Sequence, residues 1–275
     1  MKKLLSVITG LLAGSLLYAM PVLNPGAPAL LTDSTFKCDD NACWGIKFGY
    51  RGDFVYNKHM RGEWHHVDRF SLYANEGTLA LNLWDRLDIY GFVGAANVSV
   101  NTSAVDGFDS TTIDAFTAKY NTRTIGGVGI KAILWESCWG RFGTTYIGID
   151  AQYEWMGPAQ ISRTTIDGTS VAPNNSSRKY KEGQVALGIS HRICDLVPYV
   201  AATWSKARAN FGGSPIGTRV PGALGETVNL SNYENQRQWG FVVGATLVDM
   251  GRMSVTAEGR FINETALSVA ADIRF

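Results

Sequence analysis

The fold is decided by the last ten residues of the chain, ALSVAADIRF, from Ala266 to Phe275. Every second position carries an apolar side chain: Leu267, Val269, Ala271, Ile273 and Phe275. Side chains alternate between the two faces of a β-strand, so this segment predicts one apolar and one small or polar face. A strand of this kind that ends on an aromatic residue is typical of the closing strand of a transmembrane β-barrel. Phe275 would then be the insertion signal. The last strand of a soluble β-sandwich is the alternative.

Similar alternation upstream predicts about ten strands in all. They are expected at about 44–56, a segment ending at 83, 87–92 and beyond, 124–134, 144–155, 184–192, 199–205, 239–247, a segment ending at 261, and 266–275. The clearest is 144–155, where Thr145, Ile147 and Ile149 share one face. The pattern predicts an all-β, antiparallel, up-and-down transmembrane β-barrel of about ten strands, with twelve as the alternative count.

The expected connections alternate between long polar loops and tight turns. The long loops are 57–68, 97–123, 157–177 and 209–236, and the turns are 84–86, 135–141, 194–196 and 249–251. One further short connection, 263–264, falls on the long-loop side. Long loops at one end and short turns at the other are characteristic of outer-membrane barrels, in which the short turns are periplasmic. An even strand count places both termini on that periplasmic side.

Tryptophans favour the membrane over a soluble core. Seven of the eight fall near expected strand ends: Trp44, Trp84, Trp135 and Trp139 at one rim, and Trp155, Trp204 and Trp239 at the other. Trp64 falls in a loop. A soluble core would take its aromatic residues from the middle of strands, whereas membrane barrels carry aromatic girdles at both interfaces.

The N-terminus predicts export. Lys2 and Lys3 precede an apolar run that ends at Leu17-Tyr18-Ala19, which is typical of a cleaved signal peptide covering residues 1–19. An uncleaved anchor helix is the alternative, but the run is short for a bilayer span. Residues 20–43 are then expected to form a periplasmic N-terminal segment, and 44–275 the outer-membrane barrel. The absence of Cys directly after the expected cleavage site argues against a lipoprotein.

Composition excludes several classes of function. With 18% charged residues and a net charge of +1, the chain has no basic surface suited to nucleic acid. It lacks the common hydrolase, metalloprotease and phosphate-binding motifs, so we expect no enzyme, no cofactor and no metal site. One remote alternative is a barrel protease, built from the His and acidic residues in or beside the first loop. These are His59, His65, His66, Asp53, Glu63 and Asp68.

The four cysteines all map to the short-turn side. Cys38 and Cys43 precede the first strand, and Cys138 and Cys194 lie in short turns. In an oxidising compartment, clustered cysteines favour disulfides, within the chain or to a neighbour. Four cysteines allow three pairings, and spacing does not choose among them.

Charged residues on the polar strand faces are the candidates for lining a pore. They are Arg51, Asp53, Asp150, Glu154, Arg192, Glu258, Arg260, Asp272 and Arg274. Charges inside a barrel must be paired or hydrated, because burying one alone is costly. Mixed signs allow two interpretations: a salt-bridged plug, or a water-filled and weakly selective path.

Several segments resemble the chlamydial major outer membrane protein family. The likeness is carried by LALNLWDRLDIY at 79–90, AILWE at 132–136 and PYVAATWSKAR at 198–208. It is strongest from Gly240 to the C-terminus, including EGRF at 258–261 and DIRF at 272–275. The expected mature start, MPVLNP at 20–25, is also similar. The long loops do not match.

The resemblance implies a general porin of the outer membrane, commonly trimeric and cross-linked through disulfides in the cell envelope. Family members are longer and have been pictured with about sixteen strands, so a ten-stranded barrel would have a narrower lumen. We therefore expect a porin-like protein for small solutes that also contributes to the envelope structure. A non-conducting structural barrel, or an adhesin acting through its surface loops, is the alternative. The expected partners are outer-membrane lipid, the barrel-assembly machinery, a homotrimer and disulfide-linked envelope proteins.

Overall fold

The computed structural model describes most of the chain. The described residues are 20–32, 44–62, 67–106, 112–166, 168–171, 177–211, 216–217, 227–228, 233–249 and 251–275. The signal peptide expected at 1–19 lies outside them, as do Cys38, Cys43, Trp64, His65 and His66.

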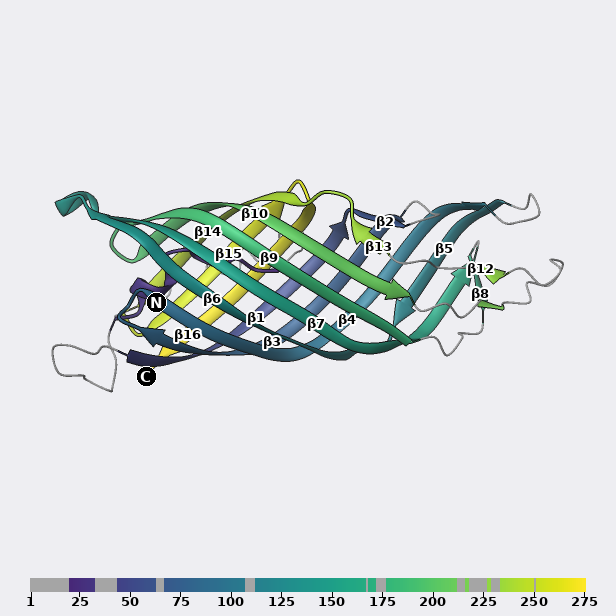
Figure 1. Ribbon diagram of the computed structural model, residues 1–275, viewed down its shortest axis with the longest axis horizontal. Helices are drawn as coiled ribbons and strands as arrows, with labels where there is room; N and C mark the ends of the chain where they lie inside the picture. The colour runs from purple at the N-terminus through teal and green to yellow at the C-terminus, as the bar shows by residue number, and fades with distance from the viewer. Residues whose placement is uncertain are drawn as a thin grey trace, which may run out of the picture.

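Ten strand positions close into a ring (Figure 1). In ring order the strands are β1 (Trp44–Lys58), β3 (Val67–Leu83), β4 (Leu87–Asp106), β6 (Arg123–Cys138), β7 (Thr144–Ile166), β9 (Ser177–Arg192), β10 (Leu196–Phe211), β14 (Trp239–Asp249), β15 (Met253–Phe261) and β16 (Glu264–Arg274). β5 (Thr112–Tyr120) also lies between β4 and β7, nearer the long loops than β6, and residues 121–122 separate the two strands. Each neighbouring pair is antiparallel, so the predicted up-and-down barrel of ten strands is confirmed.

The barrel is closed where the C-terminal strand β16 meets β1. The two strands pair antiparallel from Lys47 opposite Arg274 to Lys58 opposite Glu264. The backbone N–H of Phe275 adds a hydrogen bond of 2.9 Å to the carbonyl oxygen of Ile46. Closure pairs each of the ten described wall strands on both sides, so the backbone groups of the wall can be satisfied within a bilayer.

The two ends of the barrel differ. Both labelled termini lie at the end that carries the short turns, which we call the short-turn end (Figure 1). The opposite end, the long-loop end, carries the smaller elements, among them β2 (Met60–Gly62), β8 (Thr169–Val171) and β13 (Tyr233–Asn235). β11 (Ile216–Gly217) and β12 (Thr227–Val228) pair only with each other. A four-residue helix, α2 (Ala27–Leu30), and a 3₁₀ turn, η1 (Gly140–Phe142), complete the elements of the described residues. In the described part of the chain, no helix is long and apolar enough to cross a membrane.

Strands run further toward the long-loop end than the hydrophobic pattern predicted. β4 continues to Asp106, β7 to Ile166 and β10 to Phe211, so parts of the loops expected at 97–123, 157–177 and 209–236 are strand. The reason is that strand pairing uses backbone hydrogen bonds and does not require apolar side chains. Apolar alternation marks only the stretch that contacts lipid, and polar Ser, Thr and Asn residues can extend the same ladder beyond it.

The outer surface is apolar, with aromatic residues at both rims. The seven Trp residues predicted for the rims are all exposed on the outside: Trp44, Trp84, Trp135, Trp139, Trp155, Trp204 and Trp239. Between them, exposed Leu, Ile and Val residues alternate along the strands with residues that face the interior. On β9, for example, Leu187 and Ile189 are exposed, whereas Gly188 and Ser190 are buried. Such an exposed apolar band between aromatic girdles is the surface of a membrane barrel.

Candidate functional site: the barrel interior

Most of the predicted pore-lining residues point into the barrel. Seven are buried: Arg51, Asp53, Asp150, Glu154, Glu258, Arg260 and Arg274. Arg192 and Asp272 are half-buried. Arg192 lies at the short-turn end of β9, where its Nε donates to the carbonyl oxygen of Cys194 at 3.2 Å. The structure therefore describes all nine residues, and the buried ones belong to a larger network of interior charges.

The centre of the interior is held by two arginines. Arg51 forms ion pairs with Glu76 and, at 3.7 Å, with Glu154. Its guanidinium also lies 3.6 Å from the ring centroid of Phe92, in a cation–π contact. Arg260 reaches Asp53 at 2.5 Å and Glu258 at 3.4 Å. Each buried guanidinium therefore has two carboxylates, which offsets part of its desolvation cost.

A third cluster lies toward the long-loop end. Lys58 Nζ approaches Glu182 at 2.5 Å and Glu264 at 3.3 Å, and the hydroxyl of Tyr180 donates to Glu182. The residues come from β1, β9 and β16, which are distant in sequence. Ring closure is what brings them together.

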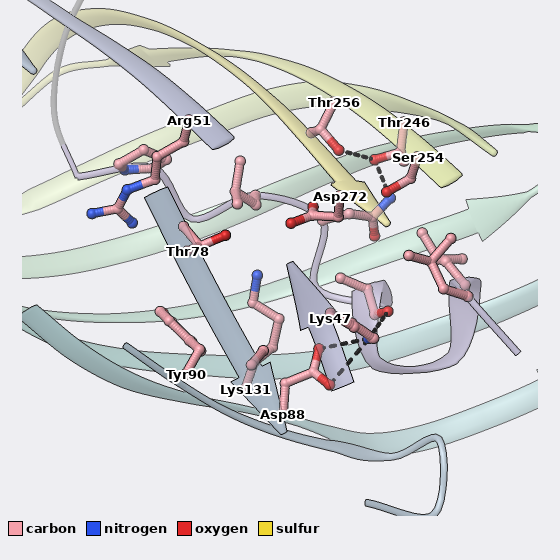
Figure 2. Close-up of a pocket in the computed structure, with 17 residues that line it drawn as sticks. Lys47, Arg51, Thr78, Asp88, Tyr90, Lys131, Thr246, Ser254, Thr256 and Asp272 are labelled. Atoms are coloured by element: carbon pink, nitrogen blue, oxygen red, sulfur yellow. Dashed lines mark hydrogen bonds and ion pairs between the residues drawn. The ribbon is translucent and has the colours of Figure 1, made fainter. Parts of the chain in front are cut away.

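The short-turn end has its own pairs. Lys47 Nζ lies 2.9 Å from Asp88, and Lys131 Nζ lies 3.8 Å from Asp150. Figure 2 shows these lysines around a small cavity, with Asp272, Thr246, Ser254 and Thr256 across it. Its volume of about 60 Å³ can hold a few water molecules.

Several interior charges are not among the predicted pore-lining residues. They are Lys47, Lys58, Glu76, Asp88, Lys131, Glu182 and Glu264. Glu76 lies upstream of the apolar positions that marked the second strand, and Glu182 lies before the first apolar residue of β9. Lys58 and Glu264 fell in predicted connections. A stricter period-2 count extended through the polar flanks would have placed Glu76, Glu182 and Glu264, because each occupies the parity of its strand's inward residues. It would have missed Lys58, because a β-bulge after Val55 shifts the alternation of β1.

The N-terminal segment, residues 20–32, lies inside the barrel. Its backbone is hydrogen-bonded by the wall: both carboxylate oxygens of Glu258 accept from the N–H groups of Val22 and Leu23, at 3.0 and 2.8 Å. Lys131 Nζ donates to the carbonyl oxygen of Val22 at 2.8 Å, and Gln152 Nε2 to that of Pro21 at 2.9 Å. The interior charges thus pair with one another and also form hydrogen bonds with the backbone of residues 20–32.

The remainder of this segment is held near the short-turn end. Asn24 Nδ2 donates to Thr246 Oγ1 at 3.0 Å, and Lys47 Nζ donates to the carbonyl oxygen of Ala27 at 3.0 Å. Leu30 and Leu31 are buried against wall residues that include Tyr146 and Val248. A peptide with buried polar backbone needs such partners, because each unpaired group would cost about 1–3 kcal/mol.

Two wall glycines make room for this segment. Gly148 of β7 and Gly188 of β9 are directly opposite in the sheet. A Cβ at Gly148 would lie 2.3 Å from the carbonyl oxygen of Pro25, and one at Gly188 would lie 2.5 Å from Pro25 Cγ. Residues 20–43 were expected to form a periplasmic N-terminal segment. Residues 20–32 lie inside the barrel, and 33–43 lie outside the described residues.

The long-loop end of the interior is apolar. Buried side chains there include Met60, Phe70, Tyr120, Tyr180 and Tyr233, which belong to one cluster. β2 and β13 contribute to this layer, and they pair with each other from Met60 opposite Asn235 to Gly62 opposite Tyr233. The described interior therefore has three levels: the N-terminal segment, the central charges and this apolar layer.

The other predicted sites are resolved only in part. Cys138 and Cys194 are exposed at the short-turn end and are not bonded to each other. Cys38 and Cys43 lie outside the described residues. Within the described residues no group of three or more His, Cys, Asp and Glu side chains could hold a metal ion. Of the hypothetical protease cluster, Asp53 is bound to Arg260 and Ser268 inside the barrel. Partial burial and the nearby Arg237 lower the pKa of His59.

Comparisons with known proteins agree with this architecture. A family profile described as Chlamydia major outer membrane protein matches residues 210–275. A major outer membrane porin of Chlamydia pneumoniae is 26% identical over an alignment of 402 positions that covers all of both chains. The serovar D porin of Chlamydia trachomatis is 24% identical over 401 positions, again with full coverage of both.

Among solved structures, a COG4313 outer membrane channel from Pseudomonas putida F1 aligns with 87% of this chain and all of that chain, at 10% identity and a TM-score of 0.37. The toluene transporter TbuX of Ralstonia pickettii aligns with 95% of this chain and 96% of that chain, at 12% identity and a TM-score of 0.34. The predicted resemblance is confirmed by the sequence comparisons: the chain is similar, over its whole length, to the chlamydial major outer membrane protein family.

Proposed function

We propose that this chain is an outer-membrane porin for the passive diffusion of small solutes. The observation that carries the proposal is a closed ten-stranded barrel with an apolar outer band and a charged interior. Its relatives are named major outer membrane porins, which supports both the function and the outer-membrane location. The porin names of these relatives also support a role without catalysis.

The N-terminal segment makes the pathway narrow. Residues 20–32 contact the wall through side chains of β7, β9, β14 and β15, whereas the wall strands are joined to each other by continuous backbone ladders. The segment can therefore leave without breaking the ladder. We propose that conduction requires its displacement, together with movement of the apolar layer at the long-loop end.

Single-channel recording in a planar bilayer tests this. The mature chain should give small, infrequent current steps, because the described interior is filled. Deleting residues 20–31 should raise the conductance or the open fraction several-fold while the barrel still folds, as judged by its mobility on a gel before and after boiling. If neither form conducts, the protein is a structural barrel and the porin proposal fails.

Other roles remain proposals about the same chain. Exposed Cys138 and Cys194 are accessible for disulfides to other envelope proteins, which supports a structural contribution. A non-reducing gel of intact envelopes would show high-mass species that disappear when both are changed to Ser. Homotrimer formation, recognition of Phe275 by the assembly machinery, and adhesion through the long loops are proposed from the sequence alone.

A further inference from the structure

A cluster of cations lies on the outer wall at the long-loop end. Lys179 and Lys181 of β9 and Lys206 and Arg208 of β10 are exposed, and they alternate with inward-facing residues. Lys181 is directly opposite Arg208, and Lys206 is opposite Gly183, so all four side chains project from one patch of the outer face. We call these four residues the cation patch. With Tyr153, Gly183 and Glu182, whose carboxylate is bound to Lys58 inside the barrel, they line a groove of about 650 Å³.

The position of the patch along the barrel is defined by the aromatic residues. On β10, the outward residues run Val200, Ala202, Trp204, and then change at once to Lys206 and Arg208. On β9, the change occurs between Val185 and Lys181. Trp155 of β7 is opposite Lys181. Since Trp marks the level of lipid headgroups, the cations lie at or just beyond that level.

The charge of the patch is mostly uncompensated. Arg208 Nε lies 2.8 Å from Glu234, but both side chains are more than half exposed. Among the described residues, Lys179, Lys181 and Lys206 make no ion pair. Like charges placed directly opposite in a sheet destabilise it, so an arrangement with Lys181 facing Arg208 calls for an external anion.

We propose that the cation patch binds the phosphate groups of a membrane lipid headgroup on the long-loop side, with the lipid's acyl chains against the apolar faces of β9 and β10. Lysines are effective phosphate ligands. A groove that is cationic toward the long-loop end and continues onto an apolar wall matches an amphipathic phospholipid or phosphorylated glycolipid. The inference rests on the barrel being in a membrane, and not on whether it conducts.

Native mass spectrometry of the refolded barrel provides the test, with diphosphoryl lipid A as the probe. The wild type should retain the lipid at detergent concentrations that remove dephosphorylated lipid A. Lys181→Gln with Lys206→Gln should lower retention at least tenfold, whereas Lys181→Arg with Lys206→Arg should keep it. Lys119→Gln, which removes another exposed lysine at the long-loop end, is the matched control and should change nothing.

Three results would overturn the proposal. These are equal retention of both lipids, unchanged retention by the double Gln variant, and displacement of the lipid by millimolar inorganic pyrophosphate alone. The last would show a site for a free anion instead of a lipid. Gel mobility before and after boiling verifies that each variant is folded. If the Gln variant does not fold, loss of wild-type retention as salt is raised supports the ionic site, and retention that is indifferent to salt contradicts it.

Discussion

The closing strand β16 and the N-terminal segment occupy the barrel in opposite ways. β16 is part of the wall: it pairs along its length with β1 and β15 through backbone hydrogen bonds. Residues 20–32 lie within the wall and are held by side chains such as Glu258, Lys131 and Gln152. A backbone ladder depends little on which side chains are present, whereas side-chain anchors can be removed one at a time. The barrel should therefore withstand changes that release its N-terminal segment.

The largest effect should come from the end of β16. Phe275 packs edge-on against Phe48, with ring centroids 5.6 Å apart, and its N–H continues the ladder to β1. We expect Phe275→Ser to lower the amount of assembled protein in the outer membrane at least several-fold. Phe261→Ser removes an aromatic residue of the same exposed fraction, 42%, from β15 and is the control. Quantitative blots of outer-membrane fractions measure both, and equal yields would remove the special role of the C-terminus.

Next in size is the release of the N-terminal segment by a clash. Gly148→Ala places a Cβ 2.3 Å from the carbonyl oxygen of Pro25, and overpacking of this kind costs about 1–3 kcal/mol. We expect a higher open fraction in bilayer recordings and faster proteolysis within residues 20–32, with the barrel intact. Gly91→Ala is the control, because its nearest neighbour would be 3.7 Å away. If both variants behave alike, the contact with Pro25 does not hold the segment.

Glu258→Gln should have a smaller effect on the same segment. The amide keeps one acceptor oxygen, so one of the two N–H groups of Val22 and Leu23 loses its partner, and Arg260 loses one of its two carboxylates. Loss of such a buried hydrogen bond costs about 1–3 kcal/mol. Hydrogen exchange at Val22 and Leu23 should accelerate. In a chain that lacks 20–31, the substitution should change conductance much less; an equal change would mean that Glu258 acts on the wall itself.

The smallest effect is expected at the short-turn surface. Arg86 Nη2 and Glu136 Oε2 are 2.8 Å apart, but both side chains are substantially exposed. Exposed pairs contribute at most about 1 kcal/mol and are screened by salt. Arg86→Ala should leave assembly and conductance unchanged, with a loss of unfolding free energy below about 1 kcal/mol in urea titration of the refolded barrel. A larger loss would show that the Arg86–Glu136 pair stabilises the barrel more than an exposed ion pair does.

Much of the wall could be predicted because lipid imposes a simple code. Leu267, Val269 and Ile273 must alternate with small or polar residues wherever a strand has lipid on one side. The same code predicted β1, β7 and the tight turn at 84–86, which the structure confirms at Trp84-Asp85-Arg86 with positive φ at the first two residues. It weakened where the outward positions are polar or glycine, as at Asn75 and Lys181, and there Glu76 and Glu182 were missed.

By itself, then, the sequence determined the ring: its strand count, its outward faces, its aromatic rims and about half of its inward charges. What fills the ring was decided by tertiary structure. Residues 20–32 carry no strand pattern and no motif that marks them as an interior element. Their partners, among them Glu258, Gln152 and Gly148, lie more than a hundred residues away in sequence. These groups converge only when β16 meets β1, because closure creates the enclosed polar surface that the segment's backbone satisfies.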